Sequence, residues 1–227
     1  MAGLFGFFNF EKEGAGVNPD APKKKRPFLF LELYQRKIVN LIQLNLLYIL
    51  FCLPVITIGP ATAGLTYVLK RYSAGEHSWI RSDFIEHFKK NFRQGFCIGT
   101  VNLIVYILLL TNYLFLGTTA QFGFLKYTVL TIAAIFTMMQ FFTYSIMINF
   151  NMKIIDIYKD AFILTVVRIW SNLLILALIL ALLYVYIIVC GGIYYIIILL
   201  VPMFSTIGFI ATFYVGPIID KYLVYNQ

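Results

Sequence analysis

Four stretches of this chain are long, apolar and almost free of charge: residues 97–116, 125–149, 171–190 and 193–215. Each is close to the roughly 20 residues that a helix needs to cross a bilayer core of about 30 Å. Such stretches cross as helices, because a bilayer offers no water to backbone polar groups. Hydrophobic residues make up 61% of the chain and charged residues 12%, against about 45–50% and 25% in soluble domains. The sequence therefore predicts an all-α, polytopic transmembrane helix bundle.

A further apolar stretch, residues 38–69, is interrupted by Pro54 and by the pair Gly59 and Pro60. Lys and Arg gather in residues 1–37, 59–95 and 150–172, and such clusters are typical of cytoplasmic loops. If the first two clusters share one side of the membrane, the chain must return between them. We therefore expect a broken hairpin over 38–69, with arms at 40–53 and 60–69, as two short crossings or a re-entrant loop. The bundle then has five to six membrane helices.

Two segments have the pattern of amphipathic helices at the membrane surface. Residues 78–95 carry phenylalanines such as Phe84 and Phe88 at four-residue spacing among charged side chains. Asp83, Glu86 and His87 are assigned to the solvated polar side of this helix, where an acid–base or metal cluster is the less favoured alternative. Residues 153–170 form a second such helix, the elbow before the span at 171–190.

The charge pattern also predicts the domain organisation and the topology. Residues 1–37 form an N-terminal polybasic arm with a short interfacial helix at 28–37, and residues 38–227 form a single transmembrane domain. The turns at 118–124 and 191–192 contain no Lys or Arg and are expected outside. Gly191 and Gly192 predict a tight turn that makes the last two spans antiparallel neighbours. Both termini are then cytoplasmic.

No signature of an enzyme, a nucleotide site or a metal site occurs in the sequence, so no catalytic, cofactor-binding or metal-binding residue is predicted. The three cysteines lie in or beside apolar segments without nearby ligands. The net charge of +8 is attributed to contact with lipid headgroups rather than nucleic acid. All ten acidic residues lie outside the four long spans, which disfavours ion-coupled transport. The oligomeric state is left open.

Three groups of residues are candidates for function, and each is weighed against a simpler structural explanation. The first is a small-residue motif that could pack helices or hold a ligand, with packing favoured: Pro54, Thr57, Gly59, Pro60, Ala61, Thr62, Ala63 and Gly64. The second could line a polar path or join helices: Asn45, Asn102, Asn112, Gln140 and Asn149. The third is a surface for a protein partner or lipid: Lys23, Lys24, Lys25, Arg26, Arg81, Lys89, Lys90, Arg93 and Lys159. Gly95 and Gly99 add a G-x-x-x-G pattern, for which packing within the chain is the expected role.

Three stretches carry a family resemblance: NLLYILFCLPVITIGPATAGLTYVL at 45–69, DFIEHFKKNFRQG at 83–95 and IYKDAFILTVVRIWSNLLIL at 157–176. With them the chain resembles the YesL-like family of bacterial membrane proteins, a domain family of unknown function. The arm at 9–26 is similar to versions found in Gram-positive gut anaerobes. The resemblance implies no catalytic residues. It does imply an accessory role in sugar uptake, because members are commonly encoded beside carbohydrate ABC importers.

The leading hypothesis is therefore a non-enzymatic membrane protein that is accessory to a carbohydrate ABC uptake system, with the permease subunits as expected partners. In this hypothesis the helix at 78–95 and the elbow at 153–170 face cytoplasmic partners. One alternative is a passive transporter or channel for small molecules such as sugars, with the broken hairpin lining the path. A second alternative is a membrane scaffold for enzymes or lipid, based on the polybasic arm.

Overall fold

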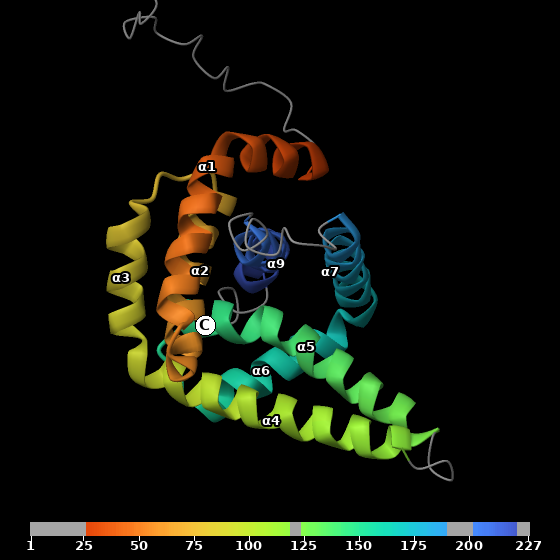
Figure 1. Ribbon diagram of the computed structural model, residues 1–227. Helices are drawn as coiled ribbons and strands as arrows, with labels where there is room; N and C mark the ends of the chain where they lie inside the picture. Colours follow the sequence, from red (N-terminus) through yellow and green to blue (C-terminus); the bar gives the residue numbers. More distant parts are fainter. Residues whose placement is uncertain (1–25, 119–123, 190–201, 222–227) are drawn as a thin grey trace, which may run out of the picture.

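The computed structural model describes residues 26–118, 124–189 and 202–221, and within these ranges the chain is all-helical. Figure 1 shows the arrangement of the elements. The helices in chain order are α1 (Arg26–Cys52), the 3₁₀ turn η1 (Val55–Thr57), α2 (Ile58–Ser73), α3 (Ile80–Lys90), α4 (Phe92–Thr118), α5 (Leu125–Asn149), α6 (Ile154–Val167), α7 (Ile169–Val189) and α9 (Met203–Ile219). The predicted helical fold class is confirmed.

The first two helices form the expected hairpin. α1 ends at Cys52, where Pro54 follows, and η1 turns the chain into α2. The interfacial helix expected at 28–37 is not separate from the membrane segment, because α1 runs unbroken through both. Figure 1 nevertheless shows the first turns of α1 lying across the end of the hairpin, with a bend before the part that runs beside α2.

α2 is the centre of the molecule, in contact with α1, α3, α4, α5 and α9. It is only 16 residues long, and most of them are buried, including both glycines and both flanking alanines of its first half. Its small residues allow neighbours on several sides to approach closely. The segment that least resembles an ordinary membrane span in the sequence thus forms the core of the structure.

The amphipathic segment at 78–95 is divided between two helices. α3 ends at Lys90, Asn91 makes the turn, and Phe92 already belongs to α4. In Figure 1, α3 runs alongside α2, and α4 leaves it sideways. Contacts between aromatic rings continue across the turn. The ring centroids of Phe88 and Phe92 lie 5.6 Å apart in an edge-on arrangement. An interfacial helix that turns sharply into a long apolar one is the expected entry to a membrane span.

Three described helices are long and apolar enough to cross a membrane by length and composition: 92–117 in α4, 125–149 in α5 and 169–188 in α7. They agree closely with three predicted spans. Their apolar side chains are largely exposed in the isolated chain, for example Leu114 at 57% in α4 and Leu174 at 72% in α7. A soluble protein does not leave such surface to water, so we conclude that the chain is a membrane protein.

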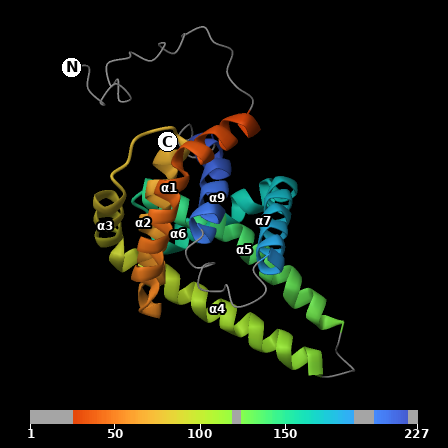
Figure 2. The same ribbon diagram turned by 45° about the horizontal axis from the view of Figure 1, so that its top comes forward.

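α9 is the described part of the last predicted span. It covers Met203–Ile219 and packs beside α1, α2 and α5, and Figure 2 shows it between the α1–α2 hairpin and α7. The expected beginning of this span at 193 and the turn at Gly191 and Gly192 lie outside the described residues. The same holds for Lys23, Lys24 and Lys25 of the arm.

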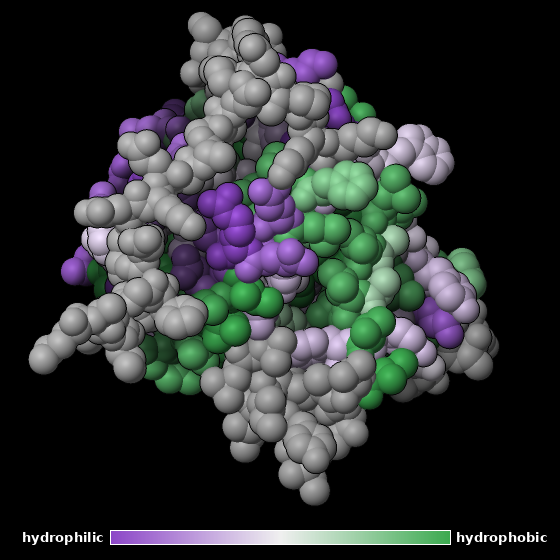
Figure 3. All heavy atoms as spheres, turned by 90° about the horizontal axis from the view of Figure 1, so that it is seen from above, coloured by the Kyte–Doolittle hydropathy of each residue, from purple (hydrophilic) through white to green (hydrophobic). Residues whose placement is uncertain are grey.

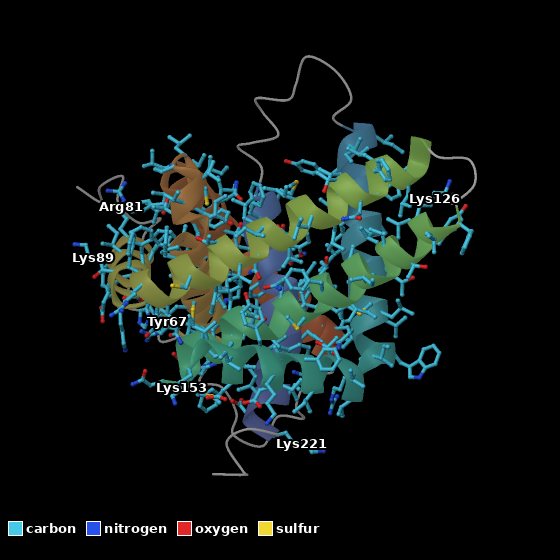
Figure 4. All side chains as sticks on the ribbon, turned by 90° about the horizontal axis from the view of Figure 1, so that it is seen from below. Tyr67, Arg81, Lys89, Lys126, Lys153 and Lys221 are labelled. Carbon is cyan, nitrogen blue, oxygen red and sulfur yellow. The ribbon has the colours of Figure 1, made fainter. Side chains whose placement is uncertain are left out.

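The face seen from above separates by polarity. In the view from above, a patch of hydrophilic residues borders a broad hydrophobic area (Figure 3). In the view from below, Arg81 and Lys89 lie on α3 at one side of the molecule, and Lys126 lies at the far end of the α4–α5 pair (Figure 4). α7 and α9 run across α4 and α5 in the same view.

Candidate functional site

The small-residue motif forms a close crossing between α2 and α4. A Cβ atom added to Gly59 would lie 1.9 Å from the carbonyl oxygen of Gly95 and 2.9 Å from the Cα atom of Gly99. The G-x-x-x-G pattern of α4 therefore holds the first turn of α2 within this chain. Such backbone approach is the use that membrane helices make of paired small residues.

The rest of the motif is distributed around this crossing. Ala61 and Ala63 are fully buried, and a Cβ atom on Gly64 would lie 2.8 Å from the carbonyl oxygen of Phe84 in α3. Thr57 donates its hydroxyl within the turn, where the carbonyl oxygens of Phe51 and Pro54 lie 2.5 and 2.6 Å away. The motif thus positions three helices, and backbone from α4 covers the start of α2.

A polar cluster lies between α4, α5 and α6, with Asn102 at its centre. The amide nitrogen of Asn102 donates to the Oε1 atom of Gln140 at 2.8 Å, and its oxygen accepts from the hydroxyl of Tyr158 at 2.8 Å. The hydroxyl of Tyr144 lies 3.4 Å from the same amide nitrogen. The Nε2 atom of Gln140 is buried and has no hydrogen-bond partner among the described atoms. A donor left in this state is costly.

A second pair of polar side chains belongs to the hairpin. The hydroxyl groups of Tyr48 in α1 and Thr62 in the motif lie 3.2 Å apart. Thr62 also donates to the carbonyl oxygen of Ile58 in its own helix at 2.7 Å, so Tyr48 supplies the proton of the interhelical bond. Amides and hydroxyls of this kind bind hydroxyl-rich ligands or join helices. In the described structure they join helices.

The five predicted intramembrane amides do not form one path. Asn102 and Gln140 are joined by a hydrogen bond. Asn45 is fully buried and accepts from the backbone N–H groups of Phe204 and Ser205 at 3.1 and 3.4 Å, at the start of α9. The side-chain amide of Asn112 donates a hydrogen bond to the carbonyl oxygen of Leu108 in its own helix. Asn149 accepts a hydrogen bond from Lys70, which ties the end of α5 to α2.

The predicted partner surface is exposed at the start of α4 and along α3. The side chains of Arg81, Lys89, Lys90 and Arg93 are exposed, as are Lys153 and Lys159 of the elbow. Gln94 donates to the carbonyl oxygen of Met152 at 2.7 Å, which brings the beginning of α4 against the segment before α6. We call Lys89, Lys90, Arg93 and Lys153 the basic face.

The interpretation of His87 as part of a solvated polar side is wrong. His87 is only 8% exposed, and its ring stacks on Tyr67 of α2 with centroids 3.3 Å apart. Burial lowers the pKa of His87, with Lys90 acting in the same direction and Glu86 and Asp83 opposing. The spacing explains the error, because position 87 lies one helical turn after Phe84 and shares its inward side.

Asp83 also has a structural role rather than a place in a cluster with His87. Its carboxylate accepts from the hydroxyl of Ser78 at 2.6 Å and from the backbone N–H of Trp79 at 3.0 Å. These bonds fix the loop that leads into α3. Among the described residues, no group of three or more His, Cys, Asp and Glu side chains is placed to hold a metal ion.

Sequence reasoning missed the phenols of the polar cluster. Tyr144 lies four residues after Gln140 and so shares its side of α5, a signal that was available. Tyr158 reaches Asn102 from α6, and only the tertiary structure reveals this contact.

A comparison with protein families gives a match to part of the chain. The model of the family described as "Protein of unknown function, DUF624" matches residues 41–113, from the second half of α1 into α4. The YesL-like proteins are part of this family, so the resemblance is confirmed over these residues. No curated protein and no solved structure matches the chain.

Proposed function

We propose that this chain, whose DUF624 region forms the crossing of α2 and α4, is a non-enzymatic membrane protein that associates with a carbohydrate ABC uptake system. The observation that carries the proposal is the basic face, which α3, α4 and the start of α6 present together. The contact between Gln94 and Met152 joins its two parts. The resemblance supplies the partner class, since YesL-like proteins are commonly encoded beside carbohydrate ABC importers.

The helix α3, which carries part of the basic face, is anchored to α1 by aromatic rings. Phe84 is fully buried, and the Phe51 ring of α1 contacts both Phe84 and Phe88 edge-on, with centroids 5.3 and 4.9 Å apart. Arg81, Glu86, Lys89 and Lys90 of α3 are exposed, whereas Asp83 is half-buried. A preformed surface loses little conformational freedom on binding. Acidic segments of a cytoplasmic partner are its natural complement.

The same charges support a cytoplasmic position for both termini. Arg26, at the start of α1, lies over the ring of Phe213 in α9 at 5.5 Å, so the start of the described chain lies beside the C-terminal half of α9. Lys126 lies at the opposite end of the α4–α5 pair from Lys89 (Figure 4). With the side richer in Lys and Arg placed inside, the termini and the basic face share the cytoplasmic side.

Copurification tests this proposal. The protein is expressed in a bacterium that encodes it beside an importer, extracted in mild detergent and isolated by a tag. We expect permease subunits to be recovered with it. The triple variant K89E/K90E/R93E should lose them, whereas K126E, which changes a charge at the far end, should keep them. Recovery of the chain alone in several mild detergents, or equal recovery with both variants, contradicts the proposal.

Passive transport has less support from the contacts at the motif. In that alternative the hairpin lines the path, yet Gly59 and Gly64 lie against the backbones of α4 and α3. Sugar flux into proteoliposomes separates the two proposals, because an accessory protein alone should give no flux above empty vesicles. A membrane scaffold would instead retain lipid or enzymes, but no permease subunit, in the copurification.

A further inference from the structure

An open groove of about 990 Å³ lies between α1 and the start of α3, apart from the motif and the polar cluster. Its walls are formed by 40–50 of α1 on one side and 77–82 on the other. This volume is at the upper end of the range for pockets that enclose small molecules.

The α1 wall changes in polarity along its length. Asn40, Gln43, Leu47 and Leu50 follow one another at helical spacing, and all four line the groove. Two amides are therefore followed by two leucines within about 15 Å of helix, at 1.5 Å per residue. Leu50 is 59% exposed. One end of the groove suits a polar group and the other suits hydrocarbon.

The opposite wall supplies positive charge. Arg81 is exposed, and in the described part of the chain no carboxylate pairs with it. No Asp or Glu lines the groove, and the nearby carboxylate of Asp83 accepts hydrogen bonds from Ser78 and Trp79. Trp79 is 73% exposed, as is typical of a side chain at the level of lipid headgroups.

We infer that the groove binds an anionic phospholipid. The phosphate lies at Arg81, where Asn40 and Gln43 donate to its oxygens, and an acyl chain follows Leu47 and Leu50. Charge complementarity selects this occupant, because an arginine without a carboxylate partner attracts anionic headgroups. The exposed leucines of the groove, Leu46 and Leu50, need a covering chain. The inference is independent of the ABC partner.

Native mass spectrometry of the purified full chain tests the inference. The protein is released from micelles that contain equal amounts of phosphatidylglycerol and phosphatidylcholine, and the lipid that stays bound is identified. We expect retention of phosphatidylglycerol. Arg81→Gln should weaken it about fivefold, the effect of one basic residue near a membrane surface. Lys89→Gln, which removes a charge from the same helix outside the groove, should leave it unchanged.

A second variant tests the apolar end. Leu50→Trp fills the groove and should reduce retention, while Leu114→Trp, at a similarly exposed leucine of α4 outside the groove, should not. Equal loss with R81Q and K89Q, equal retention of the two lipids, or retention of a neutral glycolipid in place of phosphatidylglycerol would overturn the inference. Displacement by millimolar inorganic phosphate would also overturn it, because a free anion would then suffice.

Discussion

Gly59 sits where two helix backbones come closest, and the crossing has no room for a side chain there. Its neighbours across the interface are backbone atoms of Gly95 and Gly99 rather than side-chain tips. Backbone cannot move aside by a rotamer change, so an added methyl group must separate the helices. The contact is therefore intolerant of substitutions that other helix positions accept.

We predict that Gly99→Ala lowers the thermal stability of the protein in detergent. The new Cβ atom would lie 2.8 Å from the Cα atom of Gly59, and overpacking of this kind costs about 1–3 kcal/mol. The matched control is Gly117→Ala on the same helix, where nothing lies within 4 Å of the new atom. Alanine favours the helix there, so the control should be neutral or stabilising. Equal melting temperatures for the two variants would contradict the prediction.

His87 gives the stability a pH dependence. Its pKa is lowered in the folded protein because burial against Tyr67 disfavours the charged form. As the pH falls below the ordinary value of about 6.5, the unfolded chain takes up a proton that the folded chain resists. The stability that the neutral histidine contributes is therefore fully present above about pH 6.5 and is lost as the pH falls toward the lowered pKa.

We expect the melting temperature to fall between pH 7.5 and pH 5.5, with a smaller fall in His87→Gln. The control is His77→Gln, which removes an exposed imidazole. This substitution should leave the pH dependence of the melting temperature unchanged. A thermal melt at four or five pH values measures this difference. A slope in His87→Gln equal to that of the unchanged protein would refute the role of this residue.

At the scale of elements, Asn102 fastens α4 to both α5 and α6. We predict that Asn102→Ala destabilises the protein by about 1–2 kcal/mol, because interhelical hydrogen bonds in membranes contribute about 0.6 kcal/mol each and their partners are left buried. Asn112→Ala, on the same helix, loses only a bond to its own backbone and should cost less. Denaturation in detergent mixtures compares the two, and a larger loss for Asn112→Ala would be contrary to the prediction.

Asn45 joins α1 to the first turn of α9, where its oxygen accepts two backbone N–H groups. It therefore acts as a helix cap from a distant part of the chain, and we expect Asn45→Ala to cost about 1 kcal/mol. Gln43→Ala, an exposed amide two residues earlier, serves as the control. If the two variants have the same melting temperature, the cap does not stabilise α9.

The helices themselves were largely predictable, and their contacts were not. Hydrophobic length located α4, α5 and α7, and Pro54 located the hairpin turn, because these signals are local in sequence. The boundary between α3 and α4 at Asn91 was missed, since the phenylalanine spacing continues through it. The inward position of His87 and the partners of Asn102 depend on which helices meet, which periodicity alone does not specify.

At the scale of the molecule, the long apolar helices follow different directions. α4 and α5 run side by side, while α7 and α9 cross them (Figure 4). The α1–α2 hairpin and α3 form a third group, attached at the beginning of α4 (Figure 1). The polarity of the sequence could predict a membrane protein but not these crossings, because almost every side of the long helices is apolar.

Cysteine labelling in intact cells tests the predicted topology. In a chain whose native cysteines are replaced by alanine, Lys126→Cys should react with an impermeant maleimide, whereas Lys89→Cys should react only after the cells are opened. The reason is that Lys126 adjoins the turn expected outside and Lys89 belongs to the basic face. Labelling of Lys89→Cys in intact cells would show that the orientation is opposite to the predicted one.

The crossing of Gly59 with Gly95 and Gly99 also sets an order for biogenesis. When α2 is synthesised, the backbone that will receive it does not yet exist, since α4 begins 19 residues after the last residue of α2. Until then the hairpin must wait at the bilayer surface or in the insertion machinery with its small residues uncovered. A nascent chain truncated before α4 should therefore be a substrate for membrane proteases, and one extended through residue 118 should escape them.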